Sequence, residues 1–315
     1  MTVKIAVIMD PIESIHTYKD STFAMLLEAQ RRSWSIHYIQ PNSLYVLDGR
    51  PFAQTAALSV KDQSESWFEH GAFSEIDITF FDVILMRKDP PFNMEYIYIT
   101  YALELAQKHG VLVANDARAL RNMNEKFSIM NFPDCCAPTL VTNHREQINS
   151  FIETHQDVVV KPMDAMGGES IFRITTDDKN RNSIIDQMTL KGSKTIMAQR
   201  FIPEINEGDK RILLIHGEPI PYALARVPAK GELRGNLAAG GQGHGVPLSE
   251  QDRWICTEIK PTLVENGIIF AGIDVIGNYL TEINITSPTC IRELDAQYDL
   301  NICATLFDHI ESLLN

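Results

Sequence analysis

A lysine followed by paired glycines stands near the middle of the chain. Lys161 ends the apolar run 158–161, and Gly167 and Gly168 follow it closely. Glycines let backbone N–H groups approach an anion, and the lysine ammonium supplies a point charge for phosphate. The P-loop pattern G-x-x-x-x-G-K-[ST] does not occur in the chain. Taken alone, the segment fits a phosphate-binding loop and an ordinary hairpin equally well.

Three side chains with oxygen ligands lie close together in the C-terminal part, and they are Asp274, Glu282 and Asn284. Glu282 and Asn284 are two residues apart, so on a strand they share a face. A two-residue turn at 277–278 would turn Asp274 to the opposite face, whereas a three-residue turn at 277–279 places it across from Glu282. We predict the three-residue turn, because three oxygen ligands on one face make a Mg²⁺ site with room for phosphate. The alternative is a solvated acidic hairpin, which the apolar residues around it disfavour.

Arginines form a third set in a chain with a formal charge of −13. Arginine binds carboxylate and phosphate with two parallel hydrogen bonds, although any one of these arginines alone fits a surface salt bridge. Their positions at strand ends and on a flexible segment favour anion recognition by the group. The flexible segment, 227–247, is rich in glycine and alanine, and loops of this length often act as lids. The arginines are Arg211, Arg226, Arg234 and Arg292.

Composition and charge exclude several classes of function. The chain has 28 Lys+Arg against 41 Asp+Glu and a pI near 5.1, so nucleic acid is not an expected partner. No apolar run approaches the roughly 18 residues that span a bilayer, and the N-terminus lacks a signal-peptide pattern. The five cysteines are odd in number, form no C-x-x-C and indicate reduced thiols in a cytoplasmic protein, and we interpret Cys290 as a packed thiol rather than a nucleophile.

The first third of the chain alternates strand and helix patterns, which predicts a parallel sheet with helices on both faces. In such sheets, ligands bind at the carboxyl ends of the strands. The segments at those ends are 9–12 and 87–91. The expected strands are 3–9, 35–39, 82–86 and 111–114, and the expected helices are 21–32 and 95–109.

Two further units follow. The second runs from a helix near Asn124 through strands at 158–161, 171–175 and 195–201. The third has strands at 211–215 and 221–226, a helix at 250–265, a strand pair within 268–286 and a closing helix at 302–314. We therefore predict domains at 1–122, 123–201 and 202–315, with a lid at 227–242.

Taken in this order along the chain, the motifs and predicted elements resemble those of the ATP-grasp ligases, and among them the bacterial glutathione synthetases, essentially from end to end. The most specific stretches are 86–92, 234–241 and 280–293. The resemblance implies an α/β protein with an ATP-grasp fold preceded by an N-terminal Rossmann-like parallel α/β domain. It also implies a homotetramer. Two departures from the family pattern are Ala165 in the phosphate loop and Gln242 after Gly241, at the end of the lid.

The resemblance implies a role for each candidate residue. Lys126 and Lys161 would hold the phosphates of ATP, and the loop at Gly167 and Gly168 would cover them. The residues expected around adenine and ribose are Gln199, Phe201, Ile202 and Asp209. Mg²⁺ (or Mn²⁺) would be bound by Asp274, Glu282 and Asn284. The residues that would face the acyl phosphate and the substrate carboxylates are Arg211, Arg226 and Arg234.

The implied reaction joins γ-glutamylcysteine to glycine with ATP, through an acyl phosphate, and it needs no enzyme nucleophile. Catalysis would then be mostly positioning and electrostatics. Two alternatives stay open. A sister ligase would keep the phosphate lysines and the metal face but use another acceptor, such as D-alanine or glutamate. A non-catalytic regulatory protein would bind ATP without ligation, although retention of the arginines argues against it.

Overall fold

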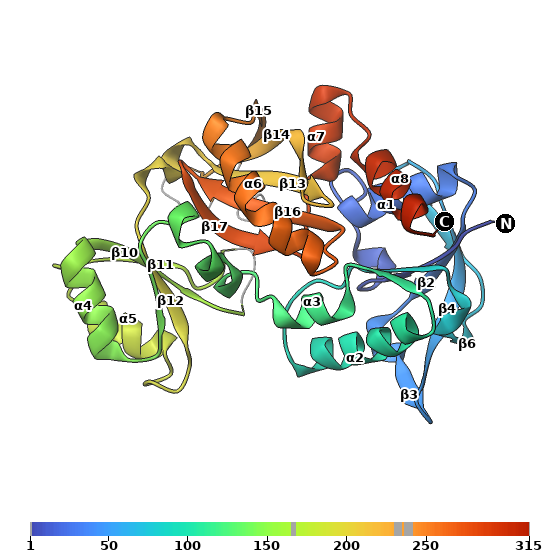
Figure 1. Ribbon diagram of the computed structural model, residues 1–315, viewed down its shortest axis with the longest axis horizontal. Coiled ribbons are helices and arrows are strands. Elements are labelled where there is room, and N and C mark those ends of the chain that lie inside the picture. The colour runs from blue at the N-terminus through green and yellow to red at the C-terminus, as the bar shows by residue number, and fades with distance from the viewer. Residues whose placement is uncertain (1, 165–167, 230–234, 236–241, 315) are drawn as a thin grey trace.

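The computed structural model describes residues 2–164, 168–229, 235 and 242–314. Three sheets follow one another along the chain, and the third lies between the other two (Figure 1). Within the described residues, no helix is long and apolar enough to cross a membrane.

The N-terminal sheet is mixed, with the strand order β3-β4-β2-β1-β7-β8. The central strands β1 (Lys4–Ile8), β2 (Ser35–Ile39), β7 (Val83–Met86) and β8 (Leu112–Ala114) pair in parallel, which confirms the predicted strands. The predicted parallel arrangement is confirmed for these strands, and the long strand β4 (Arg50–Val60), which was not predicted, pairs with β2 in the antiparallel direction and makes the sheet mixed. The remaining strands, β3 (Tyr45–Leu47), β5 (Phe68–His70) and β6 (Ser74–Asp77), pair antiparallel with β4.

Three helices belong to this sheet, and each begins at a side-chain cap. Asp20 accepts a hydrogen bond from the N–H of Phe23 at the start of α1 (Ser21–Arg31). Asn93 and Asp116 cap α2 (Met94–Lys108) and α3 (Ala117–Asn122) in the same way. Such caps satisfy N–H groups that have no partner within the helix.

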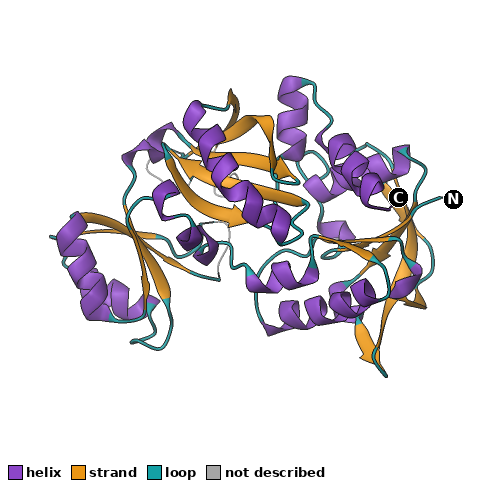
Figure 2. Cartoon of the chain, in the orientation of Figure 1, coloured by secondary structure: helices purple, strands orange, loops and turns teal. Residues whose placement is uncertain are grey.

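The second sheet is antiparallel, in the order β11-β10-β12-β9. Its strands are β9 (Thr139–Thr142), β10 (Asp157–Pro162), β11 (Phe172–Thr175) and β12 (Ile196–Arg200). Helices α4 (Arg145–His155) and α5 (Arg181–Met188) lie together on one side of it (Figure 2). A separate apolar cluster that includes Ile148, Val158 and Ile185 holds this unit together.

The third sheet is antiparallel as well, in the order β15-β14-β13-β16-β17. Its strands are β13 (Asp209–Ile215), β14 (Glu218–Val227), β15 (Gln242–Pro247), β16 (Phe270–Ile276) and β17 (Tyr279–Asn284). Gln242, at the predicted end of the lid, is the first residue of β15 and pairs with Val227. Helix α6 (Glu250–Glu265) begins at a capping box of Ser249 and Asp252 and has the predicted bounds.

The chain then returns to the N-terminal unit through α7 (Ile291–Tyr298) and α8 (Ile302–Leu314), and α8 has the predicted bounds. The indole of Trp34 and the ring of Phe307 lie 4.9 Å apart, and Arg32 forms ion pairs with Asp308 and Glu311. Helix α8 therefore packs beside α1 (Figure 1). The domain boundaries at 122 and 201 remain a prediction.

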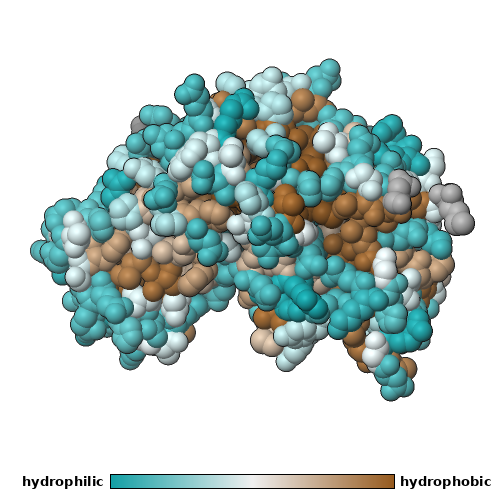
Figure 3. Space-filling model, viewed as in Figure 1, coloured by the Kyte–Doolittle hydropathy of each residue, from teal (hydrophilic) through white to brown (hydrophobic). Residues whose placement is uncertain are grey.

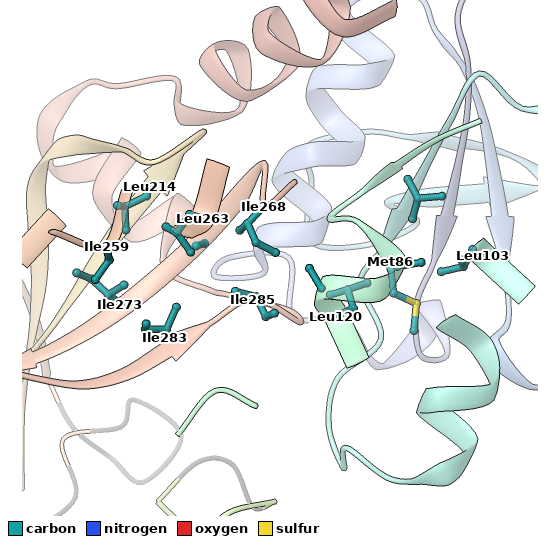
Figure 4. Packing of buried hydrophobic residues seen from close by; sticks show 14 of the residues in the cluster. Met86, Leu103, Leu120, Leu214, Ile259, Leu263, Ile268, Ile273, Ile283 and Ile285 are labelled. Atoms are coloured by element: carbon teal, nitrogen blue, oxygen red, sulfur yellow. The ribbon is translucent and has the colours of Figure 1, made fainter. Parts of the chain in front are cut away.

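The N-terminal unit and the third sheet share one apolar core. Leu120 lies next to Ile268 and Ile285 at the junction (Figure 4), and all three are buried in the same cluster. The buried side chain of Asn115 joins the same units with four hydrogen bonds. It donates to the carbonyls of Phe270 and Ile285 at 2.7 and 2.8 Å and accepts from the N–H groups of Ile269 and Phe270 at 2.8 Å each.

Replacing Asn115 tests this junction. We expect Asn115→Ala to lower the free energy of unfolding by about 2–3 kcal/mol, because it leaves buried N–H and C=O groups without partners. Urea denaturation followed by circular dichroism measures the change. Asn143→Ala, which removes one exposed hydrogen bond to the carbonyl of Gly192, is the matched control. Equal midpoints for the two variants would contradict the role assigned to Asn115.

Candidate active site

The charged residues predicted from the sequence gather on one face of the third sheet. Arg226 of β14 is paired with Asp209 of β13, and Arg211 of β13 is paired with Asp274 of β16. Asp274 is paired in turn with Glu282 of β17. Directly paired residues of antiparallel strands project from the same face, as do residues two apart on a strand. Four neighbouring strands therefore present these side chains together.

The hairpin between β16 and β17 reaches the predicted pairing by a different route. Ile276 pairs with Tyr279, so the turn has two residues, and the predicted three-residue turn was wrong. The register shifts between Leu280 and Glu282, where Thr281 is the extra residue of a bulge. Its hydroxyl donates to the carbonyl of Asp274 at 3.1 Å. The pairing of Asp274 with Glu282 is thus confirmed.

Two arginines hold the buried carboxylate of Asp274. Arg211 donates to both of its oxygens, the longer bond being 3.0 Å, and a nitrogen of Arg226 lies 3.0 Å from Oδ2. Although burial alone would raise it, Arg211 and Arg226 hold the pKa of Asp274 well below its ordinary value. Arg226 also donates to Oδ2 of Asp209 at 2.6 Å. The result is an alternating array of buried charges.

The two predicted phosphate lysines lie beside this array. Lys126 forms an ion pair with Glu282 at 2.9 Å, and its side chain is buried. Burial opposes the charge of Lys126, but Glu282 more than compensates and raises its pKa. Lys161 of β10 is buried too, and Nζ lies 3.3 Å from the carbonyl of Thr281 and 3.4 Å from Oε1 of Gln199. Burial lowers the pKa of Lys161, so an anion would stabilise its charge.

The donor atoms fit a divalent cation. Glu282 and Asn284 present oxygen atoms from one face of β17, and Asn284 donates through Nδ2 to Asp274 at 3.3 Å, which leaves its Oδ1 for a ligand. Carboxylate oxygens have more than one lone pair, so Asp274 has further capacity despite its two arginines. The described residues contain no cluster of three or more His, Cys, Asp or Glu side chains that could hold a metal. A hard cation here would therefore need phosphate or water oxygens as well.

The residues predicted to contact the nucleotide differ in which of their polar groups remain available to a ligand. Asp209 is buried, its Oδ1 has no hydrogen-bond partner among the described residues, and burial raises its pKa to about 6. The N–H of Phe201 already donates to Asp157, and its ring lies under the guanidinium of Arg173. The described residues offer the N–H of Ile202 no acceptor, so it is available to a ligand edge. Gly168 has a positive φ of 77°, whereas Gly167 and Arg234 lie outside the described residues.

A cavity of about 360 Å³ runs from this charged face to the N-terminal sheet. Its walls include both predicted strand-end segments, represented by Asp10 and Asp89, together with Lys19, which lies just before α1. Arg292 does not join the other arginines, because its partner is the exposed Asp62. The residues on and around the charged face that line the cavity are Glu125, Arg211, Arg226, Glu282, Asn284 and Cys290.

Cys290 is one of the residues that line the cavity. The thiol of Cys290 is buried, and burial raises its pKa, which agrees with a packed thiol. All five cysteines are free.

The sequence patterns did not identify Glu125 or the residues around Lys19 as part of the site. The signal for Glu125 was its place beside Lys126, where the chain passes from the first unit to the second.

Two antiparallel sheets that meet at the predicted phosphate lysines and the predicted metal ligands, together with a mixed α/β unit, are the arrangement of the ATP-grasp class of ligases. The D-cycloserine synthetase DcsG has a similar fold, with a TM-score of 0.69 and 12% identity over 99% of this chain and 100% of that one. The ATP-grasp ligase PsnB, in its complex with a minimal precursor, Mg and ADP, matches with a TM-score of 0.62 and 14% identity over 98% of each chain.

Sequence comparison narrows the class. Models of the prokaryotic glutathione synthetase N-terminal domain and ATP-grasp domain match residues 3–121 and 125–299. A glutathione synthetase of Xanthomonas campestris is 53% identical over 312 residues, which cover 99% of both chains. One of Vibrio vulnificus is 50% identical over 314 residues, 100% of this chain and 99% of that one. The chain therefore belongs to the prokaryotic glutathione synthetase family of ATP-grasp ligases.

Proposed function

We propose that the protein joins γ-glutamylcysteine to glycine at the expense of ATP, and that the charged face of the third sheet is where the acyl phosphate forms. The observation that carries the proposal is the array of Arg226, Asp209, Arg211, Asp274 and Glu282, of which Arg211, Arg226 and Glu282 line the cavity. A guanidinium has five N–H donors. Arg211 and Arg226 can therefore keep their carboxylate partners and still donate to the oxygens of a substrate carboxylate.

ATP would bind between the second and third sheets. Lys126 and Lys161 would contact its phosphates, Ile202 its adenine and the free oxygen of Asp209 a ribose hydroxyl. Gln199 would contribute by holding Lys161. Mg²⁺ or Mn²⁺ would be held by Glu282 and Asn284, with Asp274 as the third ligand, and when bound it would neutralise charge on the phosphate oxygens.

In the first step, the cysteinyl carboxylate of the dipeptide attacks the γ-phosphorus of ATP, and ADP leaves. In the second step, the amine of glycine attacks the acyl carbon, a C–N bond forms and the bond from carbon to phosphate oxygen breaks. The glycine ammonium loses one proton to solvent before the attack, and a second proton leaves the nitrogen and departs on phosphate as HPO₄²⁻. Arg211 and Arg226 stabilise the negative charge that develops on the acyl oxygen, and they are already fixed by Asp209 and Asp274.

Phosphate release tests this function. We expect release from Mg-ATP only when γ-glutamylcysteine and glycine are both present, with each omitted in turn as the control. Release that instead required D-alanine or glutamate as the acceptor would move the protein to a sister ligase. ATP binding without any release would favour the regulatory alternative.

The acyl phosphate hydrolyses in water, so we propose that residues 227–242, with Arg234 and Gly235, close over it. Gly235 contacts the charged face directly, because a Cβ there would lie 2.4 Å from the carbonyl oxygen of Arg226 and 3.2 Å from Cβ of Asp209.

The substitution Gly235→Ala should therefore lower kcat/KM by about tenfold or more, since the added methyl group pushes this segment away from Arg226. The melting temperature should stay near that of the wild type. Limited proteolysis within 227–242, with and without ATP and dipeptide, is the second measurement. Protection that is equal in the variant and the wild type would contradict the contact.

We also propose a cytoplasmic homotetramer. The five free cysteines support a reducing location. Exposed apolar side chains support association, and Figure 3 shows apolar surface on the protruding part that carries β3. On β3 and α2 these include Leu47 at 56% exposure, Tyr98 at 55% and Met94 at 52%. Sedimentation equilibrium should give four times the chain mass, and a monomer at micromolar concentration would reject the assembly.

A further inference from the structure

Glu125 holds the end of the strand that carries the metal face. Its Oε1 accepts three hydrogen bonds, from the N–H of Ile285 at 2.9 Å and from the N–H and hydroxyl of Thr286 at 3.0 and 2.8 Å. Its carbonyl accepts from the N–H of Ile283 at 2.9 Å. These bonds fix the orientation of the carboxylate and saturate Oε1.

The second carboxylate oxygen of Glu125, Oε2, is available to a ligand in the cavity. Among the described residues, Oε2 has no hydrogen-bond partner, and Glu125 forms part of the cavity wall. Burial, and then the charge of the neighbouring Glu282, raise the pKa of Glu125. Lys126, whose pKa the charge of Glu125 helps to raise, forms its ion pair with Glu282. Among the described residues Glu125 has no ion pair of its own, and a cationic group of a ligand would supply one.

The position of Glu125 in the cavity indicates which cationic group of a ligand would bind to it. Glu125 lines the same cavity as Arg211, Arg226 and Asn284, where the acyl group is expected. An attacking amine must come within about 3–3.5 Å of the acyl carbon, so the amine of the acceptor must be held in this cavity. The other carboxylates of the charged face each have an arginine or lysine partner: Asp274 pairs with two arginines, Asp209 with Arg226 and Glu282 with Lys126.

We propose that Glu125 binds the ammonium group of the acceptor amino acid through Oε2 and thereby sets the affinity for glycine. This inference rests on the proposed function. The carboxylate is held by one oxygen while the other receives the acceptor, so the amine is placed relative to β17, the strand that also carries Glu282 and Asn284. The same side chain would thus link the acceptor site to the metal face.

The substitution Glu125→Gln separates charge from structure, because the amide oxygen can still accept the hydrogen bonds from Ile285 and Thr286. We expect the KM for glycine to rise about 10- to 100-fold, the range for loss of one hydrogen bond to a charged group. The KM values for ATP and the dipeptide should change less than about threefold. Hydroxylamine, which is neutral at pH 7.5, should trap the acyl phosphate as a hydroxamate at the wild-type rate. Glu218→Gln, on the exposed end of β14, is the control.

Each outcome decides between the explanations. A wild-type protein that forms no hydroxamate refutes the proposed function itself. A wild type that forms it, together with a Glu125→Gln variant that uses glycine normally, overturns the inference and leaves the function intact. If Glu125→Gln loses hydroxamate formation as strongly as glycine ligation, and Glu125→Ala does the same, then Glu125 acts only by holding β17, which also overturns the inference.

Discussion

Replacing Glu282 with glutamine should reduce turnover by at least about 1,000-fold, the order expected when a fixed charge at the reacting phosphate is lost. Among the three predicted metal ligands Glu282 is a carboxylate with an exposed edge, since 22% of its side chain is accessible. Its charge is balanced by Lys126 at 2.9 Å. A cation bound to Glu282 would take that partner away, and a phosphate oxygen would have to replace it on Lys126.

This exchange predicts that metal and nucleotide bind better together than alone. We expect Mn²⁺, followed by electron paramagnetic resonance, to bind the wild type more tightly when ADP is present. Glu282→Gln should lose this gain, whatever its activity. The matched control is Glu218→Gln, because Glu218 also pairs with a lysine, Lys260, but is exposed. Turnover of Glu282→Gln within tenfold of the wild type would remove Glu282 from the metal site.

Sequence patterns were most informative where local rules decide the structure. Helices 250–265 and 302–314 were predicted with their observed bounds, because apolar spacing and a capping box mark α6 and apolar spacing marks α8. The strand pair around Asp274 and Glu282 was visible for the same reason, since polar residues two apart within an apolar run must share a face.

Long-range pairing was less visible. Strand β4 was missed, although Asp48 and Gly49, both with positive φ, mark the turn before it. Nothing local shows that β4 pairs with β2, so the sequence predicted the parallel strands of this sheet but not its antiparallel part. The bulge at Thr281 was also hidden, because a turn and a bulge each add one residue and give the same pairing of Asp274 with Glu282.

Only the folded structure shows which charged residues pair with one another. The sequence singled out Arg211, Arg226 and Asp274 for substrate and metal, but it did not show that they bind one another. Such pairing fixes the arginines before the substrate arrives, which lowers the entropy lost on binding. It also makes the cluster part of the core, so its residues should affect stability as well as catalysis.

Arg226→Met tests that double role, and we expect it to lower the free energy of unfolding at pH 8 by about 3–5 kcal/mol, the cost of removing one partner from a buried charge cluster. The side chain of Arg226 is only 4% exposed and lies 2.6 Å from Asp209 and 3.0 Å from Asp274. Asp274 keeps Arg211, whereas Asp209 loses its principal cation. The measurement is urea unfolding, with Arg292→Met as the control, since the partner of Arg292 is an exposed carboxylate and less than about 1 kcal/mol is expected.

The loss should depend on pH in a defined direction. The pKa of Asp209 is already raised to about 6 by burial, and without Arg226 it should rise further, while the unfolded value stays near about 3.9. Between these values the folded state binds more protons than the unfolded state, so stability falls as pH rises. The difference between Arg226→Met and the wild type should therefore shrink as the pH is lowered from 8 to 5. The double variant Arg226→Met/Asp209→Asn, which has no carboxylate at 209, should recover part of the loss at pH 8, and a gap that widened on acidification would refute this account of the cluster.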